Sequence, residues 1–278
     1  MLIPFTKAHG ARNDFLLTWR AQLPGQADDP AALARAICHR HTGAGADGWI
    51  LIANASVDAH AAIELWNSDG SRSEISGNGT RCAAALLVQN GLVESGKAGS
   101  GKADGEIRIA TGAGVKSLRL LERHGHRYSF EMNMGRAHIE ELHATLVPGR
   151  ECVILNVGNP QCAVFAGNLD FDWRTMGAEL ERHPRFPQRT NVSFIRVVDE
   201  HTLEVRFFER GAGETMSSGT GSTGAAAAAI ARGFVRSPVR VLTPSGPLDS
   251  RLENDDMYLK GPAEIVAEGQ FYYESGKD

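Results

Sequence analysis

Two serine-glycine stretches contain the residues whose types and spacing could do chemistry. One runs from Ser76 to Ala85 and the other from Ser218 to Ala227, and both have the pattern Ser-Gly-x-Gly-x-x-x-Ala-Ala-Ala. Each follows a β-like run, and a polar residue, Asn67 or Glu209, lies nine positions before the serine. A unit repeated at this distance predicts two similar halves that present the same turn to a shared site.

The chemistry of such a turn follows from its position at the start of a helix. A serine ahead of a glycine-rich and alanine-rich run is typical of a helix N-terminus, where its hydroxyl caps the first turn. The glycines let a ligand approach the backbone closely. The first N–H groups have no partner within the helix, and the helix dipole adds partial positive charge. Two such ends facing one cleft would bind an anion, most simply a carboxylate or a phosphate.

The second stretch also matches the glycine pattern of dinucleotide-binding proteins, at Gly219, Gly221 and Gly224. That pattern requires an acidic residue about 20 positions further on, at the end of the next strand. The corresponding residues, 241–245, contain no carboxylate, and the first stretch has Cys82 where the third glycine would be. We therefore do not expect a nucleotide cofactor.

Length and composition limit the other possibilities. A chain of 278 residues predicts two domains. The net charge of −4, with no cluster of Lys and Arg, argues against a nucleic-acid partner. The longest apolar stretch, 225–231, is too short to span a bilayer, so we expect no membrane contact. The first residues also lack the apolar region of a signal peptide.

The four cysteines show no disulfide framework and no Cys-x-x-Cys pair: Cys38, Cys82, Cys152 and Cys162. They predict free thiols and a cytoplasmic protein. We expect no metal site, because the one close histidine pair, His39 and His41, has no supporting cysteine or carboxylate.

Strands outnumber helices in the pattern of the chain, which predicts an α+β fold with antiparallel or mixed sheets. The helices are expected from Pro30 to about His39, from Ser76 to about Asn90, from Trp173 to Arg182 and from Ser218 to about Arg232. Alanine on all sides of the second and fourth helices suits burial against strands. Residues 94–105 predict an exposed loop, and residues 257–260 and 263–272 predict two closing strands.

Along nearly its whole length the chain resembles the diaminopimelate epimerase family. The matching stretches are 7–15, 45–48, 67–71, 77–82, 158–160, 191–194, 209–215, 219–221 and 261–264. The resemblance implies two pseudo-symmetric domains, each with mixed or antiparallel strands wrapped round a central helix. It also implies a ligand between the domains and a final strand that returns to the first. We place the halves at 1–126, with a returning segment at 268–278, and at 127–267.

The resemblance implies a cofactor-independent isomerase that inverts the α-carbon of an amino acid. In that family a pair of cysteines, one at each helix start, moves the protons. A helix N-terminus suits this role because it lowers the pKa of a thiol. Ligand contacts carry over to one set of positions: Asn13, Asn67, Gly77, Asn78, Asn159, Asn191, Glu209, Arg210, Gly219 and Thr220. Arg210 and the helix N–H groups suit carboxylates, and Glu209 suits an ammonium.

Both catalytic-cysteine positions are serine here, Ser76 and Ser218. A serine hydroxyl is much harder to ionise than a thiol, and a helix dipole contributes only on the order of 1–2 kcal/mol. Two further positions also depart from the family, Gln161 in place of a usual histidine and Arg12 in place of a usual glycine. Glu209 is the nearest titratable group that could carry the chemistry instead.

Three explanations are open at this point. Both cysteines were replaced deliberately, or a natural variant uses other groups, or the chain only binds its ligand. The leading function is an epimerase of LL- to meso-diaminopimelate in lysine and peptidoglycan precursor synthesis, impaired by the two serines. The alternatives are a carboxylate- or amino-acid-binding relative without turnover, and a related proton-shift isomerase. The expected partner is a small amino acid or dicarboxylate, and a homodimer is left open.

Overall fold

The computed structural model describes residues 1–25, 29–54, 58–93 and 105–274 of the chain. The chain divides into two compact units, Met1–Glu131 with Pro262–Asp278, and Met132–Gly261. We call these unit 1 and unit 2. Both divisions fall inside strands, β8 (Arg127–Arg136) and β17 (Asp256–Tyr272), a few residues from the divisions that we expected. The predicted loop at 94–105 lies outside the described residues as far as residue 104.

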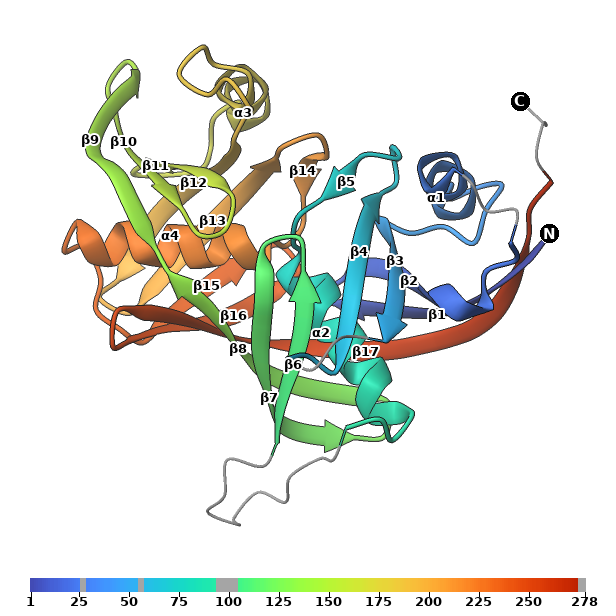
Figure 1. Ribbon diagram of the computed structural model, residues 1–278. Coiled ribbons are helices and arrows are strands. Elements are labelled where there is room, and N and C mark those ends of the chain that lie inside the picture. Colours follow the sequence, from blue (N-terminus) through green and yellow to red (C-terminus); the bar gives the residue numbers. More distant parts are fainter. Residues whose placement is uncertain (26–28, 55–57, 94–104, 275–278) are drawn as a thin grey trace. The chain divides into compact units, whose positions relative to one another are not determined.

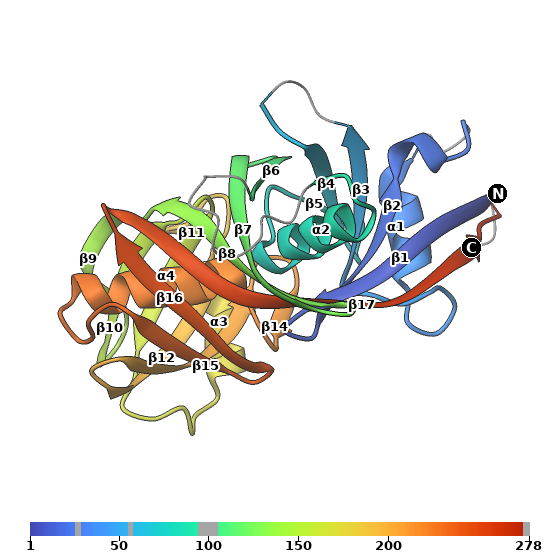
Figure 2. The ribbon, with the colours of Figure 1, turned by 90° about the horizontal axis from the view of Figure 1, so that it is seen from below.

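Unit 1 consists of strands arranged around one long helix (Figure 1). Its elements in chain order are β1 (Leu2–Gly10), β2 (Asn13–Trp19), a 3-10 turn η1 (Arg20–Gln22), α1 (Pro30–Cys38), β3 (Gly48–Asn54), β4 (Ala61–Asn67), β5 (Arg72–Ser73), α2 (Gly77–Gln89), β6 (Glu106–Thr111) and β7 (Gly114–His124), followed by β8. Strands β1 and β2 are antiparallel, β2 and β3 parallel, and β3 and β4 antiparallel. Strand β4 pairs antiparallel with β5 and parallel with β6, which pairs antiparallel with β7. The end of β17 pairs antiparallel with β1 (Figure 2).

Unit 2 repeats this order. Its elements are β9 (His138–Val147), β10 (Arg150–Asn156), β11 (Pro160–Phe165), α3 (Trp173–Glu181), β12 (Asn191–Asp199), β13 (Thr202–Glu209), β14 (Gly213–Thr215), α4 (Gly219–Ala231), β15 (Val239–Thr243) and β16 (Gly246–Glu253). Strands β10 and β11 are antiparallel, β11 and β12 parallel, and β12 and β13 antiparallel. Strand β13 pairs antiparallel with β14 and parallel with β15, which pairs antiparallel with β16. The strands β10–β16 therefore correspond to β1–β7, which confirms the predicted pseudo-symmetry.

The central helices α2 and α4 start where the repeated motif predicted. Ser76 and Ser218 are extended N-cap residues, and their hydroxyls accept the N–H groups of Gly79 at 3.1 Å and Gly221 at 3.0 Å. Helix α2 contacts β1–β4 and β6, and α4 contacts β9–β13, β15 and β16. A Cβ at Gly79 would lie 2.9 Å from Ile50, and one at Gly221 would lie 2.8 Å from Phe207. The glycines therefore allow each helix start to lie directly against a strand.

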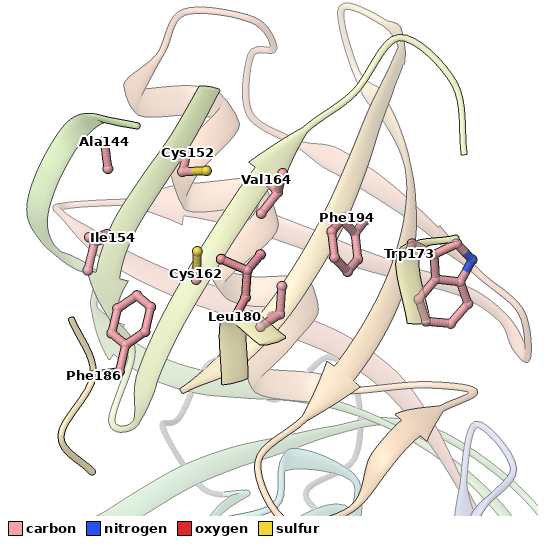
Figure 3. Close-up of a cluster of buried hydrophobic side chains, with 10 residues drawn as sticks. Ala144, Cys152, Ile154, Cys162, Val164, Trp173, Leu180, Phe186 and Phe194 are labelled. Atoms are coloured by element: carbon pink, nitrogen blue, oxygen red, sulfur yellow. The ribbon is translucent and has the colours of Figure 1, made fainter. Parts of the chain in front are cut away.

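The outer helices α1 and α3 close a second core in each unit. In unit 2 this core lies between α3 and the strands β9–β12 (Figure 3), and it includes Trp173, Leu180 and Phe194. In unit 1 the corresponding core includes Leu33, Ile37 and Trp49, and the Trp49 indole donates to Thr18 Oγ1 at 3.0 Å. Each unit is thus a layered structure with its own apolar interior, as expected for independent compact units.

The structure corrects the expected strands at several places. Strands β5, β9, β14 and β16 were not predicted, and the two closing strands expected at 257–260 and 263–272 form one strand, β17. Pro262 lies inside β17 without an N–H to donate, and its carbonyl oxygen accepts the Arg81 Nε–H at 3.1 Å. Among the described residues, no helix is both long enough and apolar enough to cross a membrane.

Candidate active site

The second serine motif contains a hydrogen-bonded pair of hydroxyl and carboxylate. The Ser218 hydroxyl donates to Glu209 Oε2 at 2.9 Å, and the Thr215 hydroxyl donates to Glu209 Oε1 at 2.6 Å. Glu209 is the last residue of β13, and Thr215 lies on the adjacent β14. The Ser218 side chain is held from two sides, because its oxygen also accepts the Gly221 N–H. The predicted residues Ser218 and Glu209 therefore lie in direct contact.

Asn159 and Thr220 join the start of β11 to the start of α4. The Asn159 amide donates to Thr220 Oγ1 at 3.3 Å and accepts the Gln161 amide N–H at 2.7 Å. Gln161 is buried against α4, where a Cβ at Gly224 would lie 3.2 Å from its side chain. The position at which the family usually has histidine therefore carries a neutral amide that orients Asn159.

Arg210 is placed by Asn191 and by the end of α3. Its backbone N–H donates to Asn191 Oδ1 at 3.1 Å, and the Asn191 amide donates to the Pro160 carbonyl at 3.0 Å. The next residue, Gly211, donates its N–H to Oε1 of Glu181, a buried carboxylate that also accepts from Arg189 at 2.8 Å. The turn that carries Glu209 and Arg210 is thus tied to both β12 and α3.

The first serine motif forms a corresponding set of contacts in unit 1. The Asn78 amide donates to Asn13 Oδ1 at 3.2 Å, and the Asn13 amide donates to Asp47 Oδ2 at 2.8 Å. Asn13 begins β2 and Asn78 lies in the first turn of α2. Gly10 fits closely against this turn, since a Cβ there would lie 3.0 Å from Asn78.

A buried arginine stabilises the orientation of these amides. Arg81 is 0% exposed, and its guanidinium donates to Asn78 Oδ1 and to the Pro262 carbonyl. Burial lowers the pKa of Arg81 to about 10, so the group is still charged at neutral pH. Because Asn78 Oδ1 accepts from Arg81, its NH₂ group must face Asn13, and the Asn13 NH₂ group must in turn face Asp47. The amide orientations thus follow from one buried cation.

Asp14 and Asp47 anchor the other end of this chain. Arg40 donates to Asp14 at 2.9 Å and to Asp47 at 2.6 Å, and Lys7 lies 3.1 Å from Asp14. Burial by itself would raise the pKa of Asp14, but the hydrogen bonds and charges of Arg40 and Lys7 lower it below its ordinary value. Asp14 is therefore an ionised anchor for the loop that carries Asn13, and Asp47 contacts that loop by accepting the Asn13 amide.

The strand registers make the two half-sites directly comparable. In unit 1, Phe15 on β2 lies opposite Gly48 on β3, and Gly48 lies opposite Asn67 on β4. In unit 2, Gln161 on β11 lies opposite Asn191 on β12 in the same way. Asn13 thus corresponds to Asn159, Asn78 to Thr220, and Ser76 to Ser218. The bond from Asn78 to Asn13 has its counterpart in the bond from Asn159 to Thr220. The position of Glu209 is occupied in unit 1 by Asn67, whose amide donates to Ser71 Oγ at 2.9 Å.

The thiols do not take the place of the serines. Cys82 is fully buried on α2, and burial raises its pKa to about 12. Burial also raises the pKa of Cys38 to about 12, and the negative charges of Asp14 and Asp47 add to this effect. Cys152 and Cys162 lie inside the unit 2 core (Figure 3). Thiols with pKa values as high as those of Cys38 and Cys82 are protonated at neutral pH, so they are poor nucleophiles or bases.

Each predicted site residue can now be placed in one of two sets. Unit 1 holds Ser76, Asn13, Asn67, Gly77 and Asn78, and unit 2 holds Ser218, Asn159, Asn191, Glu209, Arg210, Gly219 and Thr220. Sequence reasoning did not identify Thr215, Arg81, Asp47 or Glu181 as parts of these networks. Thr215 and Asp47 fall inside matched motifs, but no residue pattern indicated which group they would contact.

Comparison with solved structures defines the class of fold. A probable proline racemase from Agrobacterium radiobacter, with bound carbonate, aligns with a TM-score of 0.78 at 16% identity, covering 99% of this chain and 94% of that one. A hydroxyproline epimerase from Agrobacterium vitis, with bound trans-4-hydroxy-L-proline, aligns with a TM-score of 0.75 at 16% identity, covering 97% and 92%. The chain therefore has the two-domain fold found in these racemases and epimerases.

Sequence comparison narrows the class to one family. The profile of the diaminopimelate epimerase family matches residues 5–140 and 153–266. The diaminopimelate epimerase of Pelotomaculum thermopropionicum is 37% identical over 97% of this chain and 99% of its own length. That of Archaeoglobus fulgidus is 37% identical over 97% and 96%. The chain belongs to the diaminopimelate epimerase family.

Proposed function

We propose that this chain is a cofactor-independent isomerase of the diaminopimelate epimerase type, which acts on the α-carbon of LL-diaminopimelate or a close analogue. The observation that carries the proposal is the repeated half-site in a chain that belongs to this family. Each half-site pairs an amide side chain with a serine-capped helix start. Such helix starts attract the carboxylate next to the reacting carbon.

We assign the ligand contacts by chemistry. The N–H groups at Gly77, Asn78, Gly219 and Thr220 are suited to carboxylate oxygens, because they lie in the first turns of α2 and α4. Arg210 is assigned to a ligand carboxylate and Glu209 to the ammonium, through charge-assisted hydrogen bonds. The proposed ligand contacts also include four side-chain amides, those of Asn13, Asn67, Asn159 and Asn191. The proposal requires both helix starts to serve one substrate.

Turnover is proposed to be impaired by Ser76 and Ser218. Binding depends on amides, charges and helix N–H groups, and none of these needs a thiol. Proton transfer depends on a group that exchanges a proton near the working pH, and a serine hydroxyl does not match this requirement. The second candidate is therefore a binding protein without turnover, which the serine at both positions favours.

The test is a paired measurement of binding and stereochemistry with LL-diaminopimelate. Calorimetry should detect binding, and chiral chromatography of the same mixture should detect slow conversion to the meso form. Lysine, which lacks the distal carboxylate, is the matched control ligand and should bind more weakly. Binding without any conversion would favour the second candidate, and failure to bind would contradict both.

We also propose a cytoplasmic location and keep a homodimer as an expectation. The four cysteines are free and buried, as suits a reducing compartment. Light scattering on the protein as it elutes from a size-exclusion column would measure its molar mass and so test the homodimer.

A further inference from the structure

The two half-sites share a backbone but differ in the one group that can hold a proton. In unit 2 the capping serine donates to a carboxylate, from Ser218 to Glu209 at 2.9 Å. In unit 1 the equivalent position is Asn67, which is an amide, and its NH₂ group donates to Ser71. An amide side chain neither gains nor loses a proton in the physiological range. The pseudo-symmetry of the fold is therefore broken at the group that matters for proton transfer.

Three carboxylates that contact the unit 1 network have other tasks. Asp69 accepts the N–H and the hydroxyl of Ser71, the residue to which Asn67 donates. Asp14 and Asp47 are bound by Arg40, and Asp14 also lies 3.1 Å from Lys7. A carboxylate held by two cations is a weak proton acceptor. Asp47 accepts the Asn13 amide as well, which fixes a binding group rather than a base.

From this asymmetry we infer that the chain moves protons with a single base, Glu209, acting through the Ser218 hydroxyl on one face of the substrate carbon. The inference rests on the proposed function, since it takes the α-carbon of a bound amino acid as the reacting centre. A two-base epimerase inverts the α-carbon. A single base should instead exchange the α-proton with retention of configuration.

The step balances as follows. As the substrate Cα–H bond breaks, its proton passes to Ser218 Oγ, and the Ser218 hydroxyl proton passes to Glu209 Oε2. The C–H electron pair moves into the adjacent carboxylate, and Glu209 becomes a neutral acid. The proton or a solvent-derived one returns along the same path to the same face. Thr215 donates to the other oxygen, Oε1, and this second bond holds the carboxylate in place beside Ser218.

The test follows deuterium in heavy water with LL-diaminopimelate as the probe, by mass spectrometry for wash-in and chiral chromatography for inversion. Wash-in should exceed inversion by a factor on the order of 10², because a single base serves one face only and inversion requires a proton to be delivered to the other face. Glu209→Gln should lower wash-in at saturating diaminopimelate by roughly 10² or more, and it should also weaken binding because Glu209 is assigned to the substrate ammonium. Ser218→Ala should also lower wash-in, and it tests the same path if Glu209→Gln does not fold.

Glu214→Gln is the matched control. Glu214 lies on β14 close to Thr215, but its carboxylate is bound by Arg174 at 2.6 Å and 2.8 Å. Its replacement should leave wash-in and binding unchanged. Inversion that keeps pace with wash-in would overturn the inference and leave the epimerase proposal standing. Binding without wash-in would overturn the inference and favour the pure binding protein. Absence of binding would overturn the proposed function, and the inference with it.

Discussion

At the scale of single residues, the proposed impairment of turnover by Ser76 and Ser218 can be tested by substitution. Ser76→Cys and Ser218→Cys together should restore or create α-proton exchange with inversion, because a helix N-terminus lowers the pKa of a thiol into a useful range. Each single change should do less, since inversion requires a group on each face. The four proteins would be compared by optical inversion of diaminopimelate. A turnover of roughly 1–10³ per second for the unchanged chain would show that serine is no impediment.

Arg210 is expected to bind a substrate carboxylate through its planar fork. Arg210→Lys keeps the charge but loses the two parallel N–H groups, so the affinity for diaminopimelate should fall about tenfold or more. Arg206→Lys, on the strand β13 that precedes Arg210, is the control, because Arg206 binds Glu204 at 2.9 Å. Calorimetry would compare the affinity of both variants for diaminopimelate with that of the unchanged chain. If the Arg210 variant binds as tightly as the unchanged chain, Arg210 does not belong to the ligand site.

Asp14 should make stability depend on pH in a defined window. Its pKa in the folded chain is below the ordinary value because Arg40 and Lys7 outweigh the effect of burial. The stabilisation is therefore present above about pH 4, the ordinary range for aspartate, and is lost as the pH falls through the lower folded value. Asp14→Asn should cost about 1–2 kcal/mol at pH 7, allowing for the half-exposed Arg40.

Urea unfolding of Asp14→Asn and the unchanged chain across this pH range would measure the effect. The difference in the free energy of unfolding should shrink towards zero on acidification. Asp170→Asn, at an exposed position on the turn before α3, should cost less than about 0.5 kcal/mol at any pH. A cost for Asp14→Asn that persists unchanged at low pH would point to packing instead of charge.

At the scale of elements, the turn between β1 and β2 stores backbone strain. Ala11 and Arg12 both have positive φ, 49° and 64°, a region that costs a residue with a Cβ roughly 1–2 kcal/mol. Glycine, which the family resemblance implies at position 12, would adopt this φ without that strain. Arg12→Gly should raise the free energy of unfolding by about 0.5–1 kcal/mol, less than the full strain because glycine gains freedom in the unfolded chain. Arg12→Ala is the control, since alanine keeps the strain. An equal gain with alanine would attribute the effect to lost charge.

The elements that could be predicted from sequence are those with strong local signals. The two serine caps and the Asp29-Pro30 pair predicted where the helices α2, α4 and α1 begin, because a capping residue acts within one turn of the helix. Strand β16 has Leu248 and Leu252 on one face, but the position between them is Ser250, which is buried and polar, so the apolar alternation is lost. Strand β9 has Ala144 as its one buried residue and owes its form to pairing with β10.

The candidate site could be predicted as a set of residues but not as a network. The matched stretch 209–215 contains Glu209 and the repeated serine-glycine unit begins at Ser218, and their spacing placed both at the ends of elements. The contact between Thr215 and Glu209 depends on how β14 folds back on β13, which is a register that no local pattern specifies. Arg81 also falls inside a matched stretch, 77–82, but nothing in the sequence indicates that its side chain is buried. Its burial follows from the carbonyl of Pro262, which is distant along the chain.

At the scale of the whole molecule, the proposed function makes a statement about stoichiometry. If both half-sites serve one substrate, calorimetry should give one diaminopimelate per chain, and Asn78→Ala in unit 1 and Arg210→Lys in unit 2 should both weaken that single event. Two independent half-sites would instead give two ligands per chain, with each variant affecting only one of them. The second result would contradict the proposal of a shared substrate.

The long strand β17 has a consequence for how the chain is made. Strand β1 is synthesised first, yet its neighbour in the sheet is the last part of β17, with Leu2 opposite Tyr272 and Phe5 opposite Gly269. At ribosomal speeds of about 5–20 residues per second, this partner emerges on the order of tens of seconds later. Unit 2 is continuous from Met132 to Gly261 and can form in that interval. During translation, one edge of β1 therefore stays unpaired until β17 has been made. Unpaired strand edges are prone to aggregation, and chaperones protect nascent chains that expose them.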